Sequence, residues 1–364
     1  MKKSNSIFSK SSQKDYSILL SETTLPYDDF NNWDNRLCEL NKYVKELHPH
    51  KLFRFRRFSE NSINELKNGK IFLPTPSEFN DYYDTYINFD KNSLIEYISE
   101  AVSPKNMAHF LYSDEHSNNL LPAEICGQIA KAGADMDMEL YATKLYPEYL
   151  ELVKENTDKI VSVIKHTLVC TCFSEDILST YMWGLYAEDN KGFAIEYDID
   201  EHVFGIRKFF VDQKHYGFFS LLPVIYSDLN PNSNTYANQL LLGLCAPDLV
   251  QYFMTADYLW KTKIALYKSK KWDKEKEWRI ISTFEDIKDY DSINDLHAIF
   301  PYPPKAVYMG IAMKSENKKE IIKISKEKGI KAYDIITDSP EKFTFTYKEI
   351  NISESLNQNK IKYN

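Results

Sequence analysis

The amino-acid sequence predicts the α+β fold class with a mixed β-sheet, from three observations. Aromatic and cationic side chains alternate over Leu52–Phe58, as in a strand with two different faces. Residues 306–336 carry a strand–helix–strand pattern, and a right-handed crossover makes two such strands of one sheet parallel. Residues from about 91 to 165 are rich in Glu, Lys, Ala and Leu at helical spacing. The last segment is therefore expected to be a large helical insertion in the sheet domain.

Residues 1–50 are expected to form a helical extension ahead of the core domain. Apolar residues recur at three- and four-residue steps over Trp33–Leu47, and Pro49 ends the pattern because proline lacks the N–H that a continuing helix needs. A single core domain is expected over residues 51–336. The polar residues 337–364 are expected to form a C-terminal tail.

The first strand of the core carries two cations on one face. In Leu52–Phe58 the side chains of Phe53 and Phe55 point one way, and those of Arg54 and Arg56 point the other way. A buried cation without a partner is costly, so each arginine needs an anionic partner or a path to water. A phosphate or carboxylate ligand would supply the partner, and solvated arginines on an edge strand are the alternative.

A short helix and a second strand should follow. The helix is expected over Ser59–Asn68, with Ser62 and Glu65 at capping-box spacing as one start and Gly69 as its left-handed end. The second strand is expected at residues 71–73. The remaining core is expected to have strands at 167–174, 192–198, 306–311 and 330–336, and helices at about 177–187, 235–269 and 315–328.

Composition excludes several classes of protein. The 364 residues include only 10 glycines, and no glycine-rich loop of the dinucleotide-binding or P-loop kind occurs. The net charge of −8 argues against general binding to the DNA backbone, but an acidic protein can still carry a local basic patch. No apolar stretch is long enough for a membrane span, and five scattered cysteines suit a reducing compartment. We therefore expect a cytoplasmic protein without a membrane partner.

Two carboxylates near the C-terminal third are the first candidates for chemistry. Glu275 and Glu277 share one face with Arg279 if the segment is extended. Two neighbouring carboxylates raise the pKa of one of them and suit it to proton transfer. The alternative is a charged surface ladder, because the surrounding segment Lys268–Arg279 is rich in charges of both signs.

Two further groups have weaker signals. Asn80, Asp81 and Asp84 lie in a loop, where they could contact a ligand or brace a turn. Cys170 and Cys172 share a strand face, but two thiols and one nearby histidine fall short of a four-ligand zinc site. No metal is expected on this basis.

Several segments together resemble the DUF2971 family of bacterial proteins. They are Arg54-Phe55-Arg56, Phe79-Asn80-Asp81, Cys172-Phe173-Ser174-Glu175, Met182-Trp183-Gly184-Leu185-Tyr186-Ala187, Lys191-Gly192-Phe193 and Lys276-Glu277-Trp278-Arg279. The resemblance runs from about residue 51 to 336. Tyr82 and Leu185 depart from it, since family members often have Pro and His there.

The order of elements in that family is similar to the ADP-ribosyltransferase superfamily, which splits a mixed β core around NAD. This resemblance implies catalytic roles for Arg56 on the first strand, Ser174 on a middle strand and Glu277 on a later one, with Glu275 upstream. It implies NAD as substrate, contacted by a wider set of residues. That set is Arg54, Asn80, Asp81, Phe173, Tyr186 and Arg279.

The function expected from this resemblance is an NAD-using ADP-ribosyltransferase or NAD glycohydrolase, such as a toxin or phage-defence effector. One alternative is a non-catalytic module that recognises a nucleotide, RNA or a protein through the basic segment Lys268–Lys276. Another is a metal-dependent nuclease that uses Asp81, Asp84 and Glu277. The macromolecular acceptor of a transferase is not indicated by the sequence.

Overall fold

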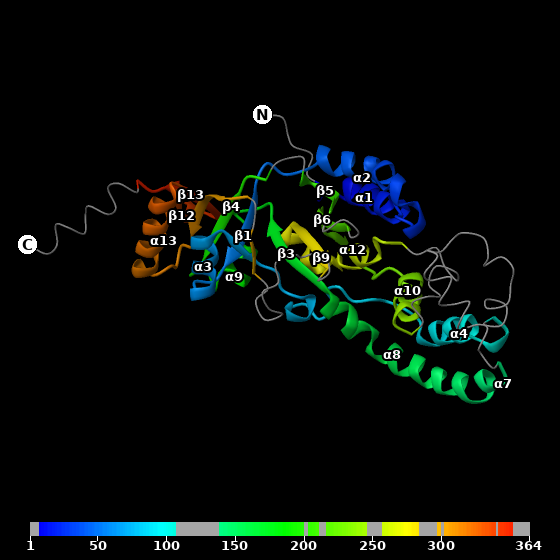
Figure 1. Cartoon of the computed structure of the whole chain (residues 1–364). Coiled ribbons are helices and arrows are strands. Elements are labelled where there is room, and N and C mark those ends of the chain that lie inside the picture. Colours follow the sequence, from blue (N-terminus) through cyan, green and yellow to red (C-terminus); the bar gives the residue numbers. More distant parts are fainter. Residues whose placement is uncertain are drawn as a thin grey trace, which may run out of the picture.

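The computed structural model describes residues 7–106, 138–199, 203–210, 216–245, 257–283, 297–299, 302–339 and 341–351. Its centre is a nine-stranded sheet of order β13-β12-β11-β4-β1-β3-β9-β6-β5 (Figure 1). Strands β11 and β12 are parallel, and the other neighbouring pairs are antiparallel. The predicted α+β class with a mixed sheet is therefore confirmed, including the parallel pair at the C-terminal end.

The strands of this sheet lie close to the predicted positions where a prediction was made. They are β1 (Leu52–Arg56), β3 (Leu168–Ser174), β4 (Phe193–Tyr197), β5 (Gly205–Phe210), β6 (Tyr216–Pro223), β9 (Glu277–Thr283), β11 (Pro304–Met309), β12 (Lys331–Ser339) and β13 (Lys342–Glu349). Two small sheets pair β2 (Lys70–Phe72) with β10 (His297–Ile299), and β7 (Ile225–Ser227) with β8 (Tyr267–Ser269).

The helices fall into an N-terminal pair, helices on the sheet and a helical arm. They are α1 (Lys10–Glu22), α2 (Trp33–Glu46), α3 (Glu60–Asn68), α4 (Lys91–Ala101), α7 (Met138–Leu140), α8 (Tyr146–Thr167), α9 (Thr180–Leu185), α10 (Asn234–Cys245), α12 (Trp260–Ile264) and α13 (Ser315–Lys328). A π-helical turn covers Tyr141–Leu145, and 3-10 turns cover Tyr27–Asn32, Pro76–Glu78 and Lys270–Glu275.

The two faces of the sheet have separate apolar cores. Side chains of α2, α3 and α13 pack in one large cluster with Leu52 of β1 and Phe173 of β3. On the opposite face, Phe53 and Phe55 of β1 pack in a smaller cluster with Trp183 of α9. The predicted alternation along this strand is therefore confirmed, because adjacent side chains enter different cores.

The N-terminal pair of helices belongs to the main core. Tyr16 and Leu20 of α1, and Leu37 and Leu40 of α2, are buried in the larger cluster. Figure 1 shows both helices beside β5 and β6, at the end of the sheet opposite α13. The predicted helical extension is thus integrated into the fold.

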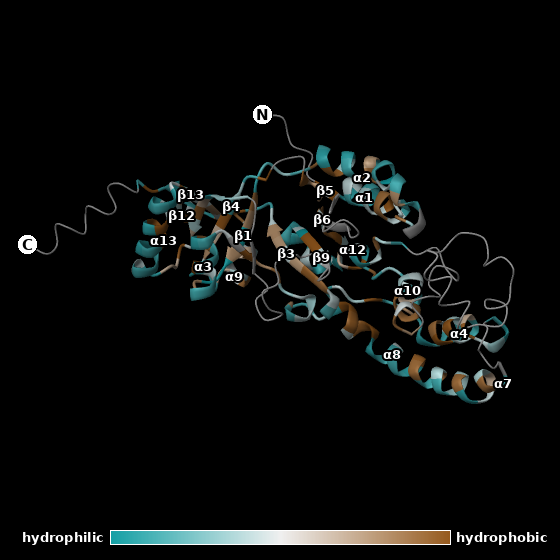
Figure 2. Ribbon diagram, viewed as in Figure 1, coloured by the Kyte–Doolittle hydropathy of each residue, from teal (hydrophilic) through white to brown (hydrophobic). Residues whose placement is uncertain are grey.

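The predicted helical insertion forms an arm that leads away from the sheet. Helix α8 runs outward from the start of β3 and packs against α4 and α10 (Figure 1). Figure 2 shows hydrophobic patches along α8, α4 and α10, whereas much of α13 is hydrophilic. Residues 107–137 of the predicted insertion lie outside the described part of the chain. Among the described residues, no helix has both the length and the apolar character to cross a bilayer.

The segment of residues 72–79 passes from one face of the sheet to the other through the gap between β1 and β3. These strands pair only at Phe53 and Ser174, and elsewhere they diverge. The carbonyl of Phe72 accepts bonds from Arg54 and from the hydroxyl of Thr171, at 2.9 and 2.6 Å. Two residues later, the carbonyl of Pro74 accepts the N–H of Cys170 at 2.9 Å. The following loop then lies on the opposite face, where its carboxylates meet β9.

A tight turn joins α9 to β4. Glu188, Asp189 and Asn190 have φ values of 51°, 53° and 67°, in the left-handed region. The turn closes through the N–H of Gly192, which donates to the carbonyl of Ala187 at 2.8 Å. A Cβ atom at Gly192 would lie 2.2 Å from the carbonyl oxygen of Arg56, so this position requires glycine.

Several predicted details differ from the structure. The box that caps α3 joins Ser59 and Ser62, so the predicted start with Ser62 and Glu65 is wrong. Strand β13 occupies part of the predicted tail, and β8 ends the segment predicted as helical over 235–269. Strands β5 and β6 had no counterpart in the predicted elements.

Candidate functional site

The candidate site lies at the start of β9, where this strand pairs with the end of β3. The pairing sets Ser174 opposite Glu277 and Cys172 opposite Arg279. Glu275 is not on the strand, because Lys270–Glu275 form a 3-10 turn and Lys276 has a left-handed φ of 46°. The condition of an extended segment is therefore met from Glu277 to Arg279 but not at Glu275. The two carboxylates nevertheless remain close, because both bond the same lysine.

Arg279 is the fully buried centre of the site. Its Nη1 and Nη2 atoms donate to the two carboxylate oxygens of Asp84 at 2.7 and 2.6 Å. Its Nε atom donates to Oε1 of Glu277 at 2.8 Å, and Nη1 also donates to the carbonyl of Ala265 at 2.6 Å. The guanidinium fork thus fixes carboxylates from two distant segments in one place.

Lys268 of β8 is shared by three carboxylates. Its Nζ atom lies 2.6 Å from Glu275, 3.1 Å from Glu277 and 3.4 Å from Asp84, and only 4% of its side chain is exposed. Burial by itself would lower the pKa of Lys268, but the surrounding carboxylates raise it well above the ordinary value. The lysine therefore stays charged and holds the carboxylates together.

The two glutamates have opposite pKa shifts. Burial and then the charge of Glu277 raise the pKa of Glu275 to about 7. Burial would also raise the pKa of Glu277, but the charges of Arg279 and Lys268 outweigh it and lower the pKa. Near neutral pH, Glu277 is ionised and Glu275 exchanges its proton. Such a separation is typical of pairs in which the two groups have different chemical roles.

Two tyrosines hold the glutamates in position. The hydroxyl of Tyr186 donates to Oε1 of Glu275 at 2.6 Å, and Oδ1 of Asn80 lies 3.4 Å from the same hydroxyl oxygen. The backbone N–H of Glu277 donates to the hydroxyl of Tyr226 at 2.9 Å. Burial raises the pKa of both phenols, so both remain protonated.

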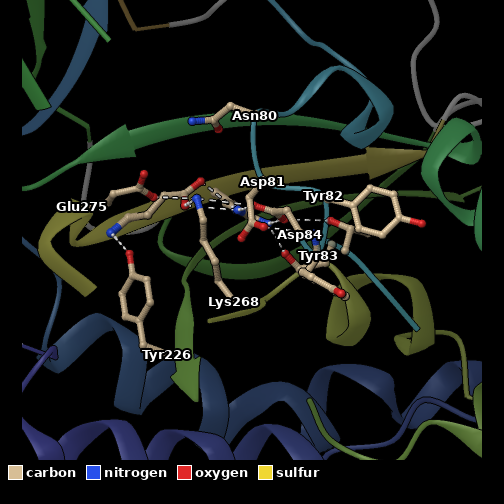
Figure 3. A network of polar contacts seen from close by, with 12 residues as sticks. Asn80, Asp81, Tyr82, Tyr83, Asp84, Tyr226, Lys268 and Glu275 are labelled. Atoms are coloured by element: carbon tan, nitrogen blue, oxygen red, sulfur yellow. Dashed lines mark hydrogen bonds and ion pairs between the residues drawn. The ribbon is translucent and has the colours of Figure 1, made fainter. Parts of the chain in front are cut away.

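The loop after the sheet crossing supplies the outer part of the site. Figure 3 shows Glu275 and Tyr226 at one end of the network, Lys268, Asp81 and Asp84 in the middle, and Tyr82 at the other end. Asp81 accepts the N–H of Tyr83 at 3.0 Å through Oδ1. Its buried Oδ2 has no hydrogen-bond partner among the described residues.

Exposed aromatic rings border this loop. The side chains of Tyr82 and Tyr83 are 70% and 66% exposed, and their rings meet edge to face with centroids 5.2 Å apart. The amine of Lys165 lies 5.0 Å from the Tyr82 ring centroid and donates to the carbonyl of Tyr82. Lys165 therefore attaches the loop to the end of α8 that joins the sheet, while the rings of Tyr82 and Tyr83 stay open to solvent.

A cavity of about 190 Å³ adjoins the network at Lys268. We call it the lysine cavity. Its wall is formed by the loop after β7, the strand β8 and the loop of residues 80–86, which we call the tyrosine loop. The lining residues are Tyr83, Ser227, Asp228, Leu229, Asn230, Tyr267, Lys268 and Ser269. Lys268 thus lies between the cavity and the buried carboxylates.

The structure brings six of the predicted site residues together. Asn80, Asp81, Tyr186, Glu275, Glu277 and Arg279 all belong to this region. Ser174 lies beside them, and its hydroxyl donates to the backbone carbonyl of Glu275 at 2.7 Å. It therefore supports the turn that presents Glu275.

Three other predicted residues lie away from the carboxylates. Because Phe53 pairs with Ser174, alternation places Arg54, Arg56 and Phe173 on the other face of the sheet. Arg56 donates to Oε1 of Glu65 at 2.8 Å, and Arg54 lies 3.5 Å from Oε2 of the same residue. The anionic partner that these cations require is thus a carboxylate of α3. Phe173 packs edge to face on Tyr197.

The other residues of the site had little signal in the sequence. Lys268 was one cation among several in a charge-rich segment, and Tyr226 lies on the short strand β7, for which no element was predicted. The sequence indicates Asp84 as a loop residue and as a nuclease carboxylate, but not as a partner of Arg279. Cys170 and Cys172 lie on β3, whereas His166 bonds to the carbonyl of Ser162 within α8. Among the described residues, no three His, Cys, Asp or Glu side chains are grouped so that they could hold a metal ion.

Comparison with known proteins gives one match. The family model described as protein of unknown function (DUF2971) matches residues 182–280, which supports the resemblance to that family. The matched segment includes Tyr186, Lys268, Glu275, Glu277 and Arg279, but not the loop with Asp84. No curated protein and no solved structure matches the chain.

Proposed function

We propose that this protein is an NAD-using enzyme that cleaves the bond between nicotinamide and ribose, as an ADP-ribosyltransferase or an NAD glycohydrolase. The observation that carries the proposal is the buried pair of Glu275 and Glu277, whose carboxylates lie 2.6 and 3.1 Å from the same Nζ atom of Lys268. Their opposite pKa shifts support it. An ionised carboxylate suits the positive charge that develops on the ribose, and a carboxylate with a pKa near 7 suits a general base.

The charges of the site fit a cationic substrate. The carboxylates of Asp81, Asp84, Glu275 and Glu277 are offset by two buried cations, Lys268 and Arg279. Lys165, near Asp81 and Asp84, is a third cation, so the site has an excess of one negative charge when Glu275 is ionised. That charge favours the pyridinium ring of NAD and the oxocarbenium-like transition state over their neutral products. Exposed Tyr83, in the wall of the lysine cavity, offers an aromatic surface to the same ring.

The proposed reaction assigns each glutamate one role. The bond between the ribose C1′ and the nicotinamide nitrogen breaks, and its electron pair leaves with neutral nicotinamide. Water or an acceptor group attacks C1′ and transfers its proton to the ionised form of Glu275. Glu277, held by Arg279 and Lys268, stays ionised throughout. The nucleophile reaches Glu275 by displacing the hydroxyl of Tyr186, which bonds Glu275 and the exposed Asn80.

Release of nicotinamide from NAD tests the proposal. Glu275→Gln and Glu277→Gln should each lower the rate by about 10²–10⁴-fold, the range found for positioned acid–base groups. Wild-type activity should rise with pH through about 7 as Glu275 loses its proton, and Glu275→Gln should remove this dependence. Glu320→Gln, at an exposed ion pair with Lys67, is the matched control and should keep full activity.

A wild-type protein that releases no nicotinamide, with water or with a cell extract as acceptor, would contradict the proposal. Equal rates for Glu275→Gln and wild type would contradict it as well. Circular dichroism and the urea midpoint of each variant show whether a loss of activity reflects loss of the fold.

The two alternative functions receive less support from the same contacts. In the basic segment Lys268–Lys276, Lys268 is buried, Lys270 pairs with Asp228 and Lys276 pairs with Asp176. These three cations are therefore engaged within the protein, whereas Lys271 and Lys274 of the same segment are exposed. For a metal-dependent nuclease, both oxygens of Asp84 are already bonded to Arg279.

A further inference from the structure

A second cavity lies next to the lysine cavity. It measures about 120 Å³, and we call it the tyrosine cavity. The two cavities share Asn230 and Tyr267 in their walls. A ligand that occupies both cavities would therefore pass Asn230 and Tyr267.

The walls of the tyrosine cavity suit a flat ring with polar edges. Three aromatic side chains line it, namely Tyr86, Tyr236 and Tyr267, together with the apolar Leu20 and Ile264. Ser21, Asn232 and Ser233 add polar groups at its margin. Aromatic and aliphatic walls with a few hydrogen-bonding groups are the usual environment of a bound purine base.

The one charged residue in this wall is neutralised by its own partner. Lys263 has its Nζ atom 2.7 Å from Oδ2 of Asp257, and their side chains are 3% and 9% exposed. The same amine donates to the carbonyl of Ser21 at 3.4 Å. Because no unpaired cation lines the cavity among the described residues, an uncharged ring suits it better than a phosphate group.

The shared wall is held in place before any ligand binds. The side-chain amide of Asn230 donates to the backbone carbonyl of Tyr86 at 2.7 Å, and the backbone carbonyl of Asn230 accepts from the side-chain amide of Asn88 at 2.9 Å. The hydroxyls of Tyr267 and Ser17 lie 3.3 Å apart. These contacts connect the tyrosine loop, the loop after β7 and helix α1, so binding requires little ordering of the wall.

We propose that the tyrosine cavity binds the adenine base of the dinucleotide whose nicotinamide end lies at Glu275 and Glu277. This assignment rests on the proposed function for the identity of the complete ligand. It makes a separate claim about binding, because an isolated adenosine should occupy the tyrosine cavity whether or not the carboxylate pair is catalytic.

Two ligands of different length test the assignment. Tyr236→Leu removes a stacking ring and keeps an apolar wall, and Ser21→Trp partly fills the cavity from the margin of α1. Each variant should raise the KM for NAD by about tenfold or more, while the KM for nicotinamide riboside, which lacks adenine, stays unchanged. Tyr347→Leu, on the distant strand β13, is the matched control and should change neither value.

Titration calorimetry with adenosine separates the two proposals. Binding to the wild-type protein that both variants weaken by about tenfold supports the tyrosine cavity, even if NAD is not cleaved. Absence of adenosine binding, binding that both variants leave unchanged, or equal effects of the variants on NAD and nicotinamide riboside would each overturn the assignment. If the protein cleaves NAD and nicotinamide riboside but gives any of these results, the adenine assignment is wrong and the proposed function still stands.

Discussion

At the scale of single residues, the site depends on three carboxylates sharing two buried cations. Arg279 and Lys268 lower the pKa of Glu277, while burial and Glu277 raise that of Glu275 to about 7. Replacing either cation would leave buried carboxylates without compensation, which typically destabilises a protein by about 3–5 kcal/mol. The chemistry of the site and the stability of the fold are therefore coupled through the same side chains.

The raised pKa of Glu275 predicts how stability depends on pH. Its ordinary value of 4.5 applies to the unfolded chain, so between pH 4.5 and about 7 the folded protein binds this proton more tightly. The free energy of unfolding should therefore fall as the pH rises through this window, by about 1–3 kcal/mol. Urea unfolding gives the free energy of unfolding of the wild type and of Glu275→Gln at each pH in this window. The difference between the two proteins measures the contribution of Glu275.

The variant should lose this part of the pH dependence. Glu277, whose pKa is lowered, contributes stability that is already present above pH 4.5, so it does not alter the slope in this window. The prediction is wrong if both proteins have parallel profiles, or if the wild type gains stability relative to Glu275→Gln as the pH rises.

At the scale of elements, the turn between α9 and β4 fixes the position of Tyr186. Gly192→Ala would bring a Cβ atom to 2.2 Å from the carbonyl of Arg56, and a backbone carbonyl in the sheet moves only at a cost. The variant should lose about 1–3 kcal/mol of unfolding free energy, as overpacking generally does. Thermal unfolding should show a lower midpoint.

Gly184 provides the control for this substitution. It lies in α9, and a Cβ atom there would meet nothing within 4 Å. Gly184→Ala should be neutral or stabilise the protein by about 0.5–1 kcal/mol, because alanine favours helix. Equal midpoints for Gly192→Ala and wild type would show that the sheet accommodates the extra atom.

The elements with strong local signals were predictable from the sequence. Helix α13 has the predicted bounds, since Gly329 provides a left-handed end with φ of 65°. The alternation in β1 was also clear. Strand β13 was not, because its side chains are largely exposed and its pattern gives no buried face. A strand of this kind depends on its neighbour, and sequence periodicity does not contain the pairing.

The candidate site was most predictable where its residues are close in sequence. Glu275, Glu277 and Arg279 stand close together in the chain, so their proximity needed no knowledge of the fold. Asp84 lies 195 residues from Arg279, and only the sheet crossing brings it to β9. The placement of Arg56 on the opposite face depends on the single pairing of Phe53 with Ser174.

At the scale of the whole molecule, helices α1 and α2 share one core with the sheet. We therefore expect a single cooperative unfolding transition rather than separate melting of the N-terminal pair. Leu20→Ala, at a position that is 1% exposed, should lower the urea midpoint of this transition and reduce the free energy of unfolding by about 2–5 kcal/mol. Ile18→Ala, in the same helix but 46% exposed, should have little effect.

A second transition that only Leu20→Ala shifts would contradict this expectation. It would mean that α1 and α2 form a unit of their own. Tryptophan fluorescence is a suitable probe, because Trp33 lies in α2 and Trp278 in β9, at the two parts whose unfolding is compared.

The crossing of the sheet by residues 72–79 has a consequence for the rate at which the protein folds. Phe53 pairs with Ser174, and Ala194 with Tyr308, so the central strands join partners more than a hundred residues apart. Closing such long loops is entropically costly and slows folding. Because the segment at Pro74 bonds Cys170 in the gap between β1 and β3, it has to be in place as these strands meet. The centre of the sheet should therefore close late, after α13 and its flanking parallel strands have formed locally.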